Sequence, residues 1–327
     1  MTTAGPSSLP SLDTLLKGLI EGDRRSLAQT LSIIERGGDQ ADATLRRIAA
    51  MRSHDATPSA TLGVTGPPGS GKSTLVDALV AHRGAHGDRI AVVAVDPSSP
   101  LTGGAILGDR VRLRPANSSA DNVYMRSIAA RGSLGGLATM VPGALRVIEA
   151  AGWPTVIIET VGVGQSEVAV AAQADTTVVV VNPDSGDEVQ ANKAGLLEMA
   201  DVFVVNKSDR EGASRTLKEL HAMLHFGAKR EWTVPVLRTT ATEDEGIVEV
   251  WSAIDDHRRY LETSGEGRRR NVERLRAEID QRIAAQLRAR VLTLERSDEG
   301  RAVYDQVEQG LLDPVSAAVR LLATLGL

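Results

Sequence analysis

Nine consecutive residues constrain the fold of this 327-residue chain more than any others. They read Gly66-Pro67-Pro68-Gly69-Ser70-Gly71-Lys72-Ser73-Thr74, and the first eight match the pattern GxxxxGK[ST]. An apolar run, Thr61–Thr65, precedes them, and a helix is expected from Lys72 onward. In such a loop the backbone N–H groups converge on phosphate oxygens, and the helix N-terminus adds positive charge. The pattern predicts a phosphate-binding loop in which Lys72 reaches the β- and γ-phosphates and Ser73 binds Mg²⁺.

Around this loop, short apolar runs alternate with stretches of helical length. The runs are mostly Val and Ile without polar alternation, which is typical of strands buried on both faces. They are Thr61–Thr65, Ile90–Val95, Thr155–Glu159, Thr176–Val181, Val202–Val205 and Val234–Leu237. Helices between such strands form βαβ units. We therefore expect an α/β fold over residues 58–261, a P-loop NTPase whose mostly parallel sheet is flanked by helices.

Helical extensions are predicted on both sides of this domain. Residues 1–57 form the expected N-terminal extension, in which Ser11 and Asp23 are placed as N-caps of two amphipathic helices. Residues 262–327 form the expected C-terminal helical arm, which begins with a charged hinge at Glu262–Arg270.

The predicted arm carries an apolar stripe. Apolar residues recur every three or four positions from Val272 to Leu294, and Asp313-Pro314 is a typical start for a last helix. Such a stripe has to be buried, either against a partner subunit in a homodimer or against the chain's own domain.

Composition narrows the function classes. The chain has 37 Lys and Arg against 42 Asp and Glu, a net charge of −5, and only 2% aromatic residues. Both values disfavour a nucleic-acid partner, which needs basic surfaces and stacking rings. The absence of cysteine excludes disulfides, Fe–S clusters and thiolate zinc sites. Because the sequence shows no signal core and no apolar run of ~20 residues, we expect a cytoplasmic protein with no membrane partner.

A second motif addresses the base of the nucleotide. The run Val202–Val205 leads into Asn206-Lys207-Ser208-Asp209, an NKxD pattern. The Asp209 carboxylate can accept from N1–H and from the exocyclic amine of guanine, whereas adenine offers neither donor there. Asn206 would brace neighbouring loops and Lys207 would lie along the base. After the next strand, a backbone N–H of Thr239-Thr240-Ala241 is placed to meet guanine O6, and Thr240, Ala241 and Thr242 are the candidate nucleotide-binding residues there.

A third motif supplies carboxylates for a metal ion. Glu159-Thr160-Val161-Gly162 is a DxxG-type sequence with Glu in place of Asp. Its carboxylate would hold Mg²⁺ directly or through water, and the Gly162 N–H would sense the γ-phosphate. Asp96 and Asp109 are further candidate metal or water contacts, although Asp96 could instead cap a turn. The candidate catalytic set is Lys72, Asp96, Asp109, Glu159 and Lys193.

The residue after Gly162 predicts slow intrinsic hydrolysis. Small GTPases place a water-orienting Gln there, and this chain has Val163. We expect a partner or a bound state to accelerate hydrolysis, with Arg110 or Lys193 as charge-stabilising groups. The acidic loop that begins at Asn182 is either a solvated cap or a nucleotide-responsive contact surface.

Together these motifs resemble the metallocentre-assembly P-loop GTPases named for a glutamate in their third motif, and within them the MeaB/ArgK branch. Three segments carry the resemblance: Asp96–Arg110 (DPSSPLTGGAILGDR), Glu159–Glu167 (ETVGVGQSE) and Asn182–Lys193 (NPDSGDEVQANK). The match extends roughly from Leu12 to Tyr260. Within the last segment, Asp184–Lys193 matches what the family calls a third switch.

The resemblance implies a homodimeric GTPase that uses Mg²⁺ and GTP or GDP. It would act as a chaperone for an adenosylcobalamin-dependent acyl-CoA mutase, typically methylmalonyl-CoA mutase, by gating cofactor delivery and protecting the mutase. Adenosylcobalamin would be met only through that partner.

Three other functions stay open at this point. A nickel-inserting maturation GTPase would need Cys or His motifs, and this chain has no cysteine and six histidines without an obvious cluster. A P-loop kinase corresponds to the older ArgK label of a transport kinase, and Asp209 disfavours its use of ATP. A scaffold that only binds nucleotide would show no turnover.

Overall fold

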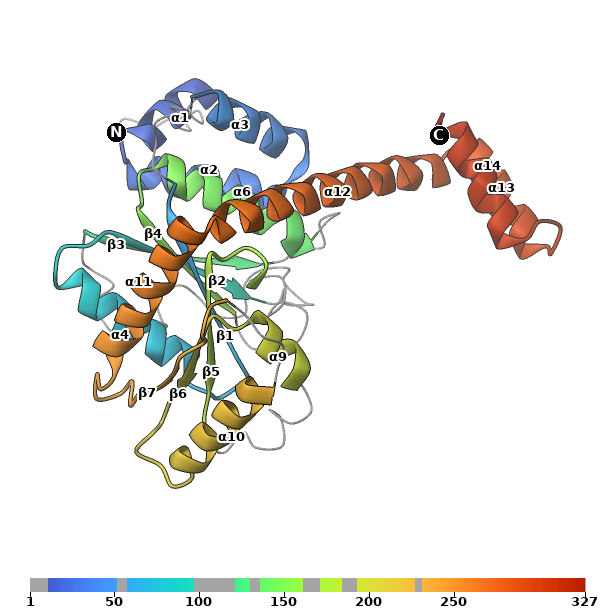
Figure 1. Cartoon of the computed structure of the whole chain (residues 1–327). Helices are drawn as coiled ribbons and strands as arrows, with labels where there is room; N and C mark the ends of the chain where they lie inside the picture. The colour runs from blue at the N-terminus through green and yellow to red at the C-terminus, as the bar shows by residue number, and fades with distance from the viewer. Residues whose placement is uncertain are drawn as a thin grey trace, which may run out of the picture.

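The computed structural model describes residues 11–51, 58–96, 121–129, 136–160, 171–183, 193–226 and 231–326. Within these ranges, a seven-stranded sheet forms the centre of the molecule (Figure 1). Its strands are β1 (Ala60–Thr65), β2 (Ile90–Asp96), β3 (Val123–Ala129), β4 (Thr155–Thr160), β5 (Thr176–Val181), β6 (Val202–Val205) and β7 (Val236–Arg238). The order is β3-β2-β4-β1-β5-β6-β7, and all neighbours pair in parallel. The predicted parallel α/β fold is confirmed.

Helices cover both faces of the sheet. The described helices are α1 (Leu12–Ile20), α2 (Arg24–Arg36), α3 (Gly38–Met51), α4 (Lys72–Gly84), α6 (Gly136–Ala150), α9 (Lys193–Met199), α10 (Ala213–Phe226), α11 (Ile247–Ser264), α12 (Glu266–Glu295), α13 (Asp298–Glu308) and α14 (Pro314–Thr324). One apolar core joins α1, α2, α3 and α6 to β2, β3 and β4, and a second joins α9 and α10 to β5 and β6. On the opposite face, α4 and α11 pack against the central strands. None of the described helices combines the length and apolar composition that a bilayer crossing requires.

The N-terminal helices begin at the predicted caps. The Ser11 side chain accepts from the Thr14 N–H, and the Asp23 carboxylate accepts from the Ser26 N–H at 2.8 Å. These bonds satisfy backbone donors that a first helical turn leaves unpaired. The α2 helix then ends at Gly37, whose φ of +67° suits a residue without Cβ.

The edge strand β3 was missed by the sequence pattern. Its side chains include Arg126 and Ser127, so it lacks the uninterrupted apolar run of the central strands. Arg126 is accommodated by a bidentate bond to Glu35 of α2 at 3.0 Å and by a bond to the Ser32 hydroxyl. A charged strand is stable here because α2, far away in sequence, supplies the counter-charge.

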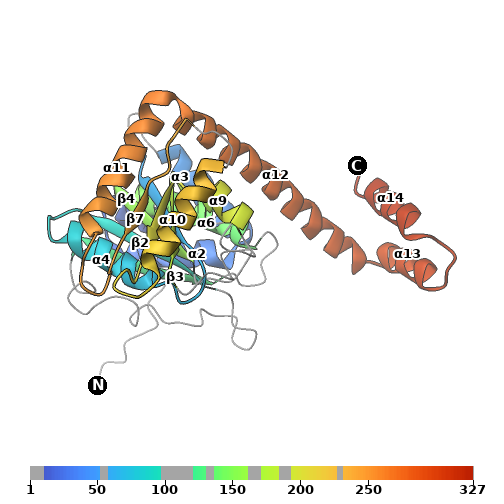
Figure 2. The ribbon, with the colours of Figure 1, turned by 60° about the horizontal axis from the view of Figure 1, so that its bottom comes forward.

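The C-terminal arm leaves the body as one long helix. Figures 1 and 2 show α12 projecting outward, with α13 and α14 at its far end. The hinge predicted over Glu262–Arg270 is wrong in extent, because only Gly265, at φ +78°, interrupts the helices there. In place of a flexible segment, a single left-handed residue joins α11 to α12.

The apolar stripe of α12 stays substantially exposed along its first half. Val272, Leu275, Ile279 and Ile283 are 40–59% exposed. The chain's own domain therefore covers these four side chains only in part.

Candidate functional site

The phosphate loop joins β1 to α4, and neighbouring backbone and side chains require its glycines. Gly66 has a φ of +138°, and a Cβ there would lie 2.0 Å from the Val180 carbonyl oxygen. Gly71 has a φ of +90°, and a Cβ there would lie 2.3 Å from Nδ2 of Asn206. Residues with a side chain fit neither position, so the loop's path is set by contacts to β5 and to the segment after β6.

Lys72 and Ser70 present polar groups within the loop. The buried Lys72 ammonium donates to the carbonyl oxygens of Gly66 at 2.6 Å and Pro67 at 3.0 Å. The Ser70 hydroxyl is fully buried and has no hydrogen-bond partner in the described part of the chain. An orphaned hydroxyl costs free energy unless an acceptor arrives. The loop therefore fits an anionic group with several acceptor oxygens, such as a phosphate.

Two of the predicted metal ligands lie together. The Ser73 hydroxyl donates a hydrogen bond to Oε1 of Glu159, which is 1% exposed at the end of β4. The sheet register explains this meeting, since β4 pairs with β1 and places Glu159 opposite Val64, just before the loop. A hydroxyl and a carboxylate oxygen are the donor set that Mg²⁺ prefers. These two residues fit the ion.

The other predicted metal and catalytic residues lie at or beyond the described ranges. Asp96 ends β2, which pairs with β4 beside Glu159, but its side chain is not among those described. Lys193 begins α9, and its side chain also falls outside them. Asp109 and Gly162, like Arg110, Val163 and the segment 184–192, lie outside the described residues.

Asn206 links the predicted base-reading loop to the phosphate loop. Its amide donates to the Ser70 carbonyl at 3.0 Å. Its side-chain oxygen accepts from the Thr239 hydroxyl at 3.0 Å and from the Ala241 N–H at 3.2 Å. Three segments that are distant in the sequence are thus held by one buried amide, the bracing role predicted for it.

Lys207 and Asp209 follow on the same loop. Lys207 has a φ of +57°, and its Nζ donates to the Gly69 carbonyl at 2.7 Å, which lays the side chain over the phosphate loop. Asp209 is exposed at the rim. Because the Ser208 N–H donates to Thr239 O at 3.0 Å, the loop is fixed to the segment that follows β7.

The backbone N–H groups predicted to meet guanine O6 are engaged within the protein, and the first of them, that of Thr239, donates to the Val205 carbonyl at 3.0 Å. The Ala241 N–H donates to Asn206, and the Thr240 N–H donates to the Glu245 carbonyl at 3.2 Å. Thr242, which the sequence also placed among the nucleotide-binding residues, follows directly and is exposed.

Sequence reasoning missed one brace of the phosphate loop. The Asn182 amide donates to the Gly69 carbonyl at 3.2 Å. Asn182 directly follows β5, as Asn206 directly follows β6, and β5 pairs with β1. An Asn at the end of a strand beside the loop-bearing strand was the available signal.

The structure offers no support for a nickel site in the part of the chain that it describes. No group of three or more His, Cys, Asp or Glu side chains is placed to hold a metal there.

Known proteins with similar sequences and structures agree on one family. The family model of the methylmalonyl Co-A mutase-associated GTPase MeaB matches residues 27–296. The GTPase ArgK of Escherichia coli K12 is 35% identical over 277 residues, which cover 82% of this chain and 83% of that protein. The mitochondrial methylmalonic aciduria type A homolog of Mus musculus is 36% identical over 270 residues, which cover 78% of this chain and 65% of that protein.

A solved structure extends the likeness over the whole chain. The crystal structure of an LAO/AO transport system kinase is 27% identical and has a TM-score of 0.67. It covers 98% of this chain, and the match spans 100% of the other. With most of its length matched by the family model, the chain belongs to the MeaB family of P-loop GTPases.

Proposed function

We propose that this GTPase is a cytoplasmic chaperone for an adenosylcobalamin-dependent acyl-CoA mutase, with methylmalonyl-CoA mutase as the first candidate. The observation that carries the proposal is the match of residues 27–296 to a family described by its association with that mutase. The name of the mouse relative refers to methylmalonic aciduria, which supports a role connected with methylmalonyl compounds. In this role the protein would gate delivery of the cofactor and protect the mutase, and adenosylcobalamin would be met only through the mutase.

The phosphate loop would bind the triphosphate of GTP. Lys72 would exchange the carbonyls of Gly66 and Pro67 for the β- and γ-phosphates, and the Ser70 hydroxyl would gain the acceptor that it lacks. Ser73 and Glu159 would hold Mg²⁺, whose charge offsets that of the phosphates. We propose that Asp96 and Asp109 also contact the metal ion and that, with Lys193, they take part in GTP hydrolysis.

The NKSD loop would read guanine through Asp209. Asn206 fixes this loop against the phosphate loop, which supports a rigid distance between phosphate and base. Lys207 would cover the base with its aliphatic stem.

We also propose that the arm forms a homodimer. The exposed stripe of Val272, Leu275, Ile279 and Ile283 supports this. Covering exposed apolar side chains with those of a second copy removes them from water, which stabilises the dimer. Ile279→Glu should shift the protein to a monomer in sedimentation experiments. Val248→Glu is the matched control, since Val248 is 60% exposed on α11 and should leave the mass unchanged. A dimer that survives Ile279→Glu would count against this interface.

Co-purification tests the chaperone proposal. The full-length protein is mixed with methylmalonyl-CoA mutase and with other acyl-CoA mutases, in GDP and in a non-hydrolysable GTP analogue. A complex whose amount depends on the nucleotide is expected with at least one mutase. If no mutase is retained in either nucleotide, the chaperone role fails and the GTPase remains.

The fate of the γ-phosphate tests the reaction. Radiolabelled phosphate released to water is the expected result for a GTPase. Label found on a small molecule or a protein would instead support a kinase role, the activity for which the structurally similar LAO/AO transport system kinase is named.

A further inference from the structure

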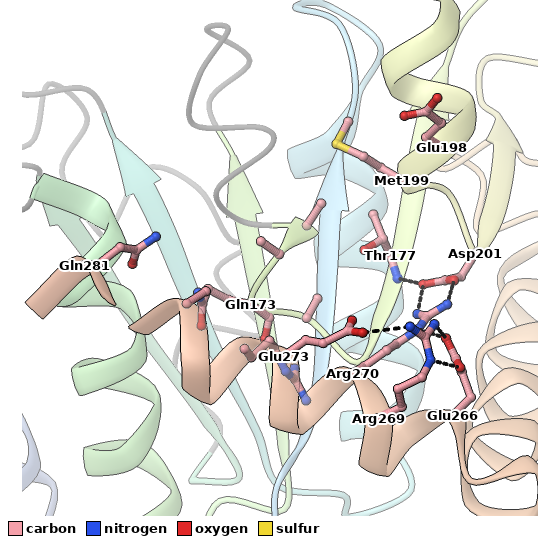
Figure 3. Close-up of a pocket in the computed structure, with 15 residues that line it drawn as sticks. Gln173, Thr177, Glu198, Met199, Asp201, Glu266, Arg269, Arg270, Glu273 and Gln281 are labelled. Carbon is pink, nitrogen blue, oxygen red and sulfur yellow. Dashed lines mark hydrogen bonds and ion pairs between the residues drawn. The ribbon is translucent and has the colours of Figure 1, made fainter. Parts of the chain in front are cut away.

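The first half of α12 is attached to the α/β domain and the N-terminal helices by ion pairs of its charged side chains. The apolar side chains of the same half stay exposed. Four residues at intervals of four each pair with a different segment of the body, and they are Arg270, Arg274, Glu278 and Arg282. Arg270 binds Asp201 with two bonds of 3.1 and 3.2 Å, and Figure 3 shows this pair beside Glu266 and Arg269. Because the desolvation of charges offsets most of their attraction, such an attachment is weaker than an apolar one of equal size.

The first two of these pairs reach the sheet itself. Arg274 binds the Asp175 carboxylate at 2.6 Å. Asp175 immediately precedes β5, and its other carboxylate oxygen accepts from the Thr61 N–H at 2.9 Å. Asp201 immediately precedes β6, and it accepts from the Thr177 N–H at 2.9 Å. Each aspartate therefore connects an arginine of the arm to the amino-terminal end of a central strand.

The other ends of the same two strands hold the phosphate loop. Asn182 follows β5 and donates to Gly69 O at 3.2 Å, while Asn206 follows β6 and donates to Ser70 O at 3.0 Å. Both strands are completely buried, and each is hydrogen-bonded to its neighbours in the sheet. Each strand thus runs from an arm-bound aspartate to a loop-bound asparagine.

We propose that β5 and β6 couple nucleotide occupancy of the phosphate loop to the attachment of α12, with Arg270 and Arg274 as positioning residues. A phosphate bound by the N–H groups of the loop repels the carbonyl oxygens of Gly69 and Ser70 and so alters their bonds to Asn182 and Asn206. That change shifts the two strands, whose far ends hold the two aspartates. By thermodynamic linkage, releasing the arginines changes nucleotide affinity by the same factor that the nucleotide changes arm attachment. The proposal rests on the nucleotide site of the proposed function and not on the mutase.

Arg282 provides a matched control within the same helix. It pairs with Asp42 at 3.1 Å and with Glu278 at 2.8 Å, so Arg282→Gln also weakens the attachment of α12. Neither of its partners lies on β5 or β6. A general effect of loosening the arm would therefore appear in this variant too.

The test measures the affinity of the full-length protein for fluorescent GDP and for a fluorescent, non-hydrolysable GTP analogue. The double variant Arg270→Gln/Arg274→Gln should change the affinity for at least one nucleotide about 5-fold or more. Arg282→Gln should stay within about 2-fold of the wild type. Arg270→Lys/Arg274→Lys, which keeps the charges but loses the paired bonds of Arg270, should recover part of the change.

Hydrogen exchange of the α12 amides supplies the second readout. Exchange over residues 266–282 should differ between the nucleotide-free and nucleotide-bound wild type, and this difference should vanish in the double Gln variant. Unchanged affinity in the double variant, or an equal change in Arg282→Gln, overturns the coupling. A wild type that binds no guanine nucleotide would instead overturn the proposed function, so the two failures are distinguishable.

Discussion

The hydroxyl of Ser73 donates a hydrogen bond to the carboxylate of Glu159, 86 positions later in the chain. The two residues lie on different segments, the start of α4 and the end of β4, and the pairing of β4 with β1 brings them together. Since both are oxygen donors, their contact defines where a hard divalent cation would be held.

Replacing Glu159 should therefore raise the Mg²⁺ requirement of GTP hydrolysis. In Glu159→Gln the side chain keeps its shape and can still accept from Ser73, but the negative charge is lost. We expect the Mg²⁺ concentration for half-maximal hydrolysis to rise about 10-fold or more. Titration of Mg²⁺ in a phosphate-release assay measures this. Glu249→Gln, on the exposed face of α11, should behave as the wild type, and an unshifted Glu159→Gln would remove this residue from the metal site.

Asp209→Asn should change which base is bound. The carboxylate is proposed to accept two hydrogen bonds from guanine, and an amide can accept only one while presenting a donor. Affinity for GDP should fall on the order of 10–100-fold. Affinity for xanthosine diphosphate should rise, because xanthine carries an acceptor oxygen in place of the 2-amino group. Competition binding with the two diphosphates provides the comparison. Equal losses for both bases would mean that Asp209 does not read the base.

Gly66→Ala should destabilise the folded protein more than Gly69→Ala. A Cβ at residue 66 would stand 2.0 Å from the Val180 carbonyl, whereas a Cβ at residue 69 would meet nothing within 4 Å. Both glycines have positive φ, so Gly69→Ala should cost about 1–2 kcal/mol from conformation alone. We expect Gly66→Ala to lower the free energy of unfolding by about 3 kcal/mol or more. Urea unfolding of both variants decides, and equal losses would contradict the close approach of the loop to β5.

His257 should make stability depend on pH near neutrality. Its ring is fully buried, and burial lowers its pKa below the usual 6.5 more than the nearby Asp201 carboxylate raises it. The unfolded chain therefore takes up a proton at higher pH than the folded chain does. The free energy of unfolding should fall as pH drops below about 6.5, with a slope of at most about 1.4 kcal/mol per pH unit from one proton.

The variant His257→Gln isolates this contribution. Its overall stability should be lower, because Nδ1 of His257 lies 2.8 Å from the Thr176 hydroxyl and that bond is altered. Its slope between pH 7 and pH 5.5 should nevertheless be smaller than that of the wild type. His221→Gln, on the exposed side of α10, should keep the wild-type slope. Parallel curves for wild type and His257→Gln would contradict the assignment.

Local patterns predicted most of the fold. Uninterrupted Val and Ile runs identified the central strands, and side-chain caps such as Ser11 and Asp23 placed the helix starts. The strand β3 was not predicted because it contains Arg126, which is stabilised by Glu35 on α2, 91 positions away. A pattern read along a short window holds no information about such a partner.

In the candidate site, too, contiguous motifs were predicted from the sequence and contacts between distant segments were not. The phosphate loop and the NKSD sequence are contiguous, so their residue types alone predicted them, and their assigned roles stay predictions. The brace from Asn182 depends on the distance between the end of β5 and the phosphate loop, which only the sheet order supplies. The charged attachment of α12 was likewise hidden, since Asp175 and Asp201 lie in separate segments and the apolar stripe dominated the pattern.

The length of α12 means that a small rotation at its attached end moves its far end over a larger distance. Its 30 residues extend about 45 Å at 1.5 Å per residue, and the ion pairs with Asp175 and Asp201 lie near its first turns. Between Arg274 and the end of α12 about 21 residues, or about 32 Å, remain, so a tilt of about 10° at these pairs would carry the far end through about 6 Å. The pair α13 and α14, held together by Val303, Ala317 and Leu321, would travel as one body. A small rotation of α12 at the Asp175 and Asp201 pairs is thus converted into a displacement of α13 and α14 of several ångströms.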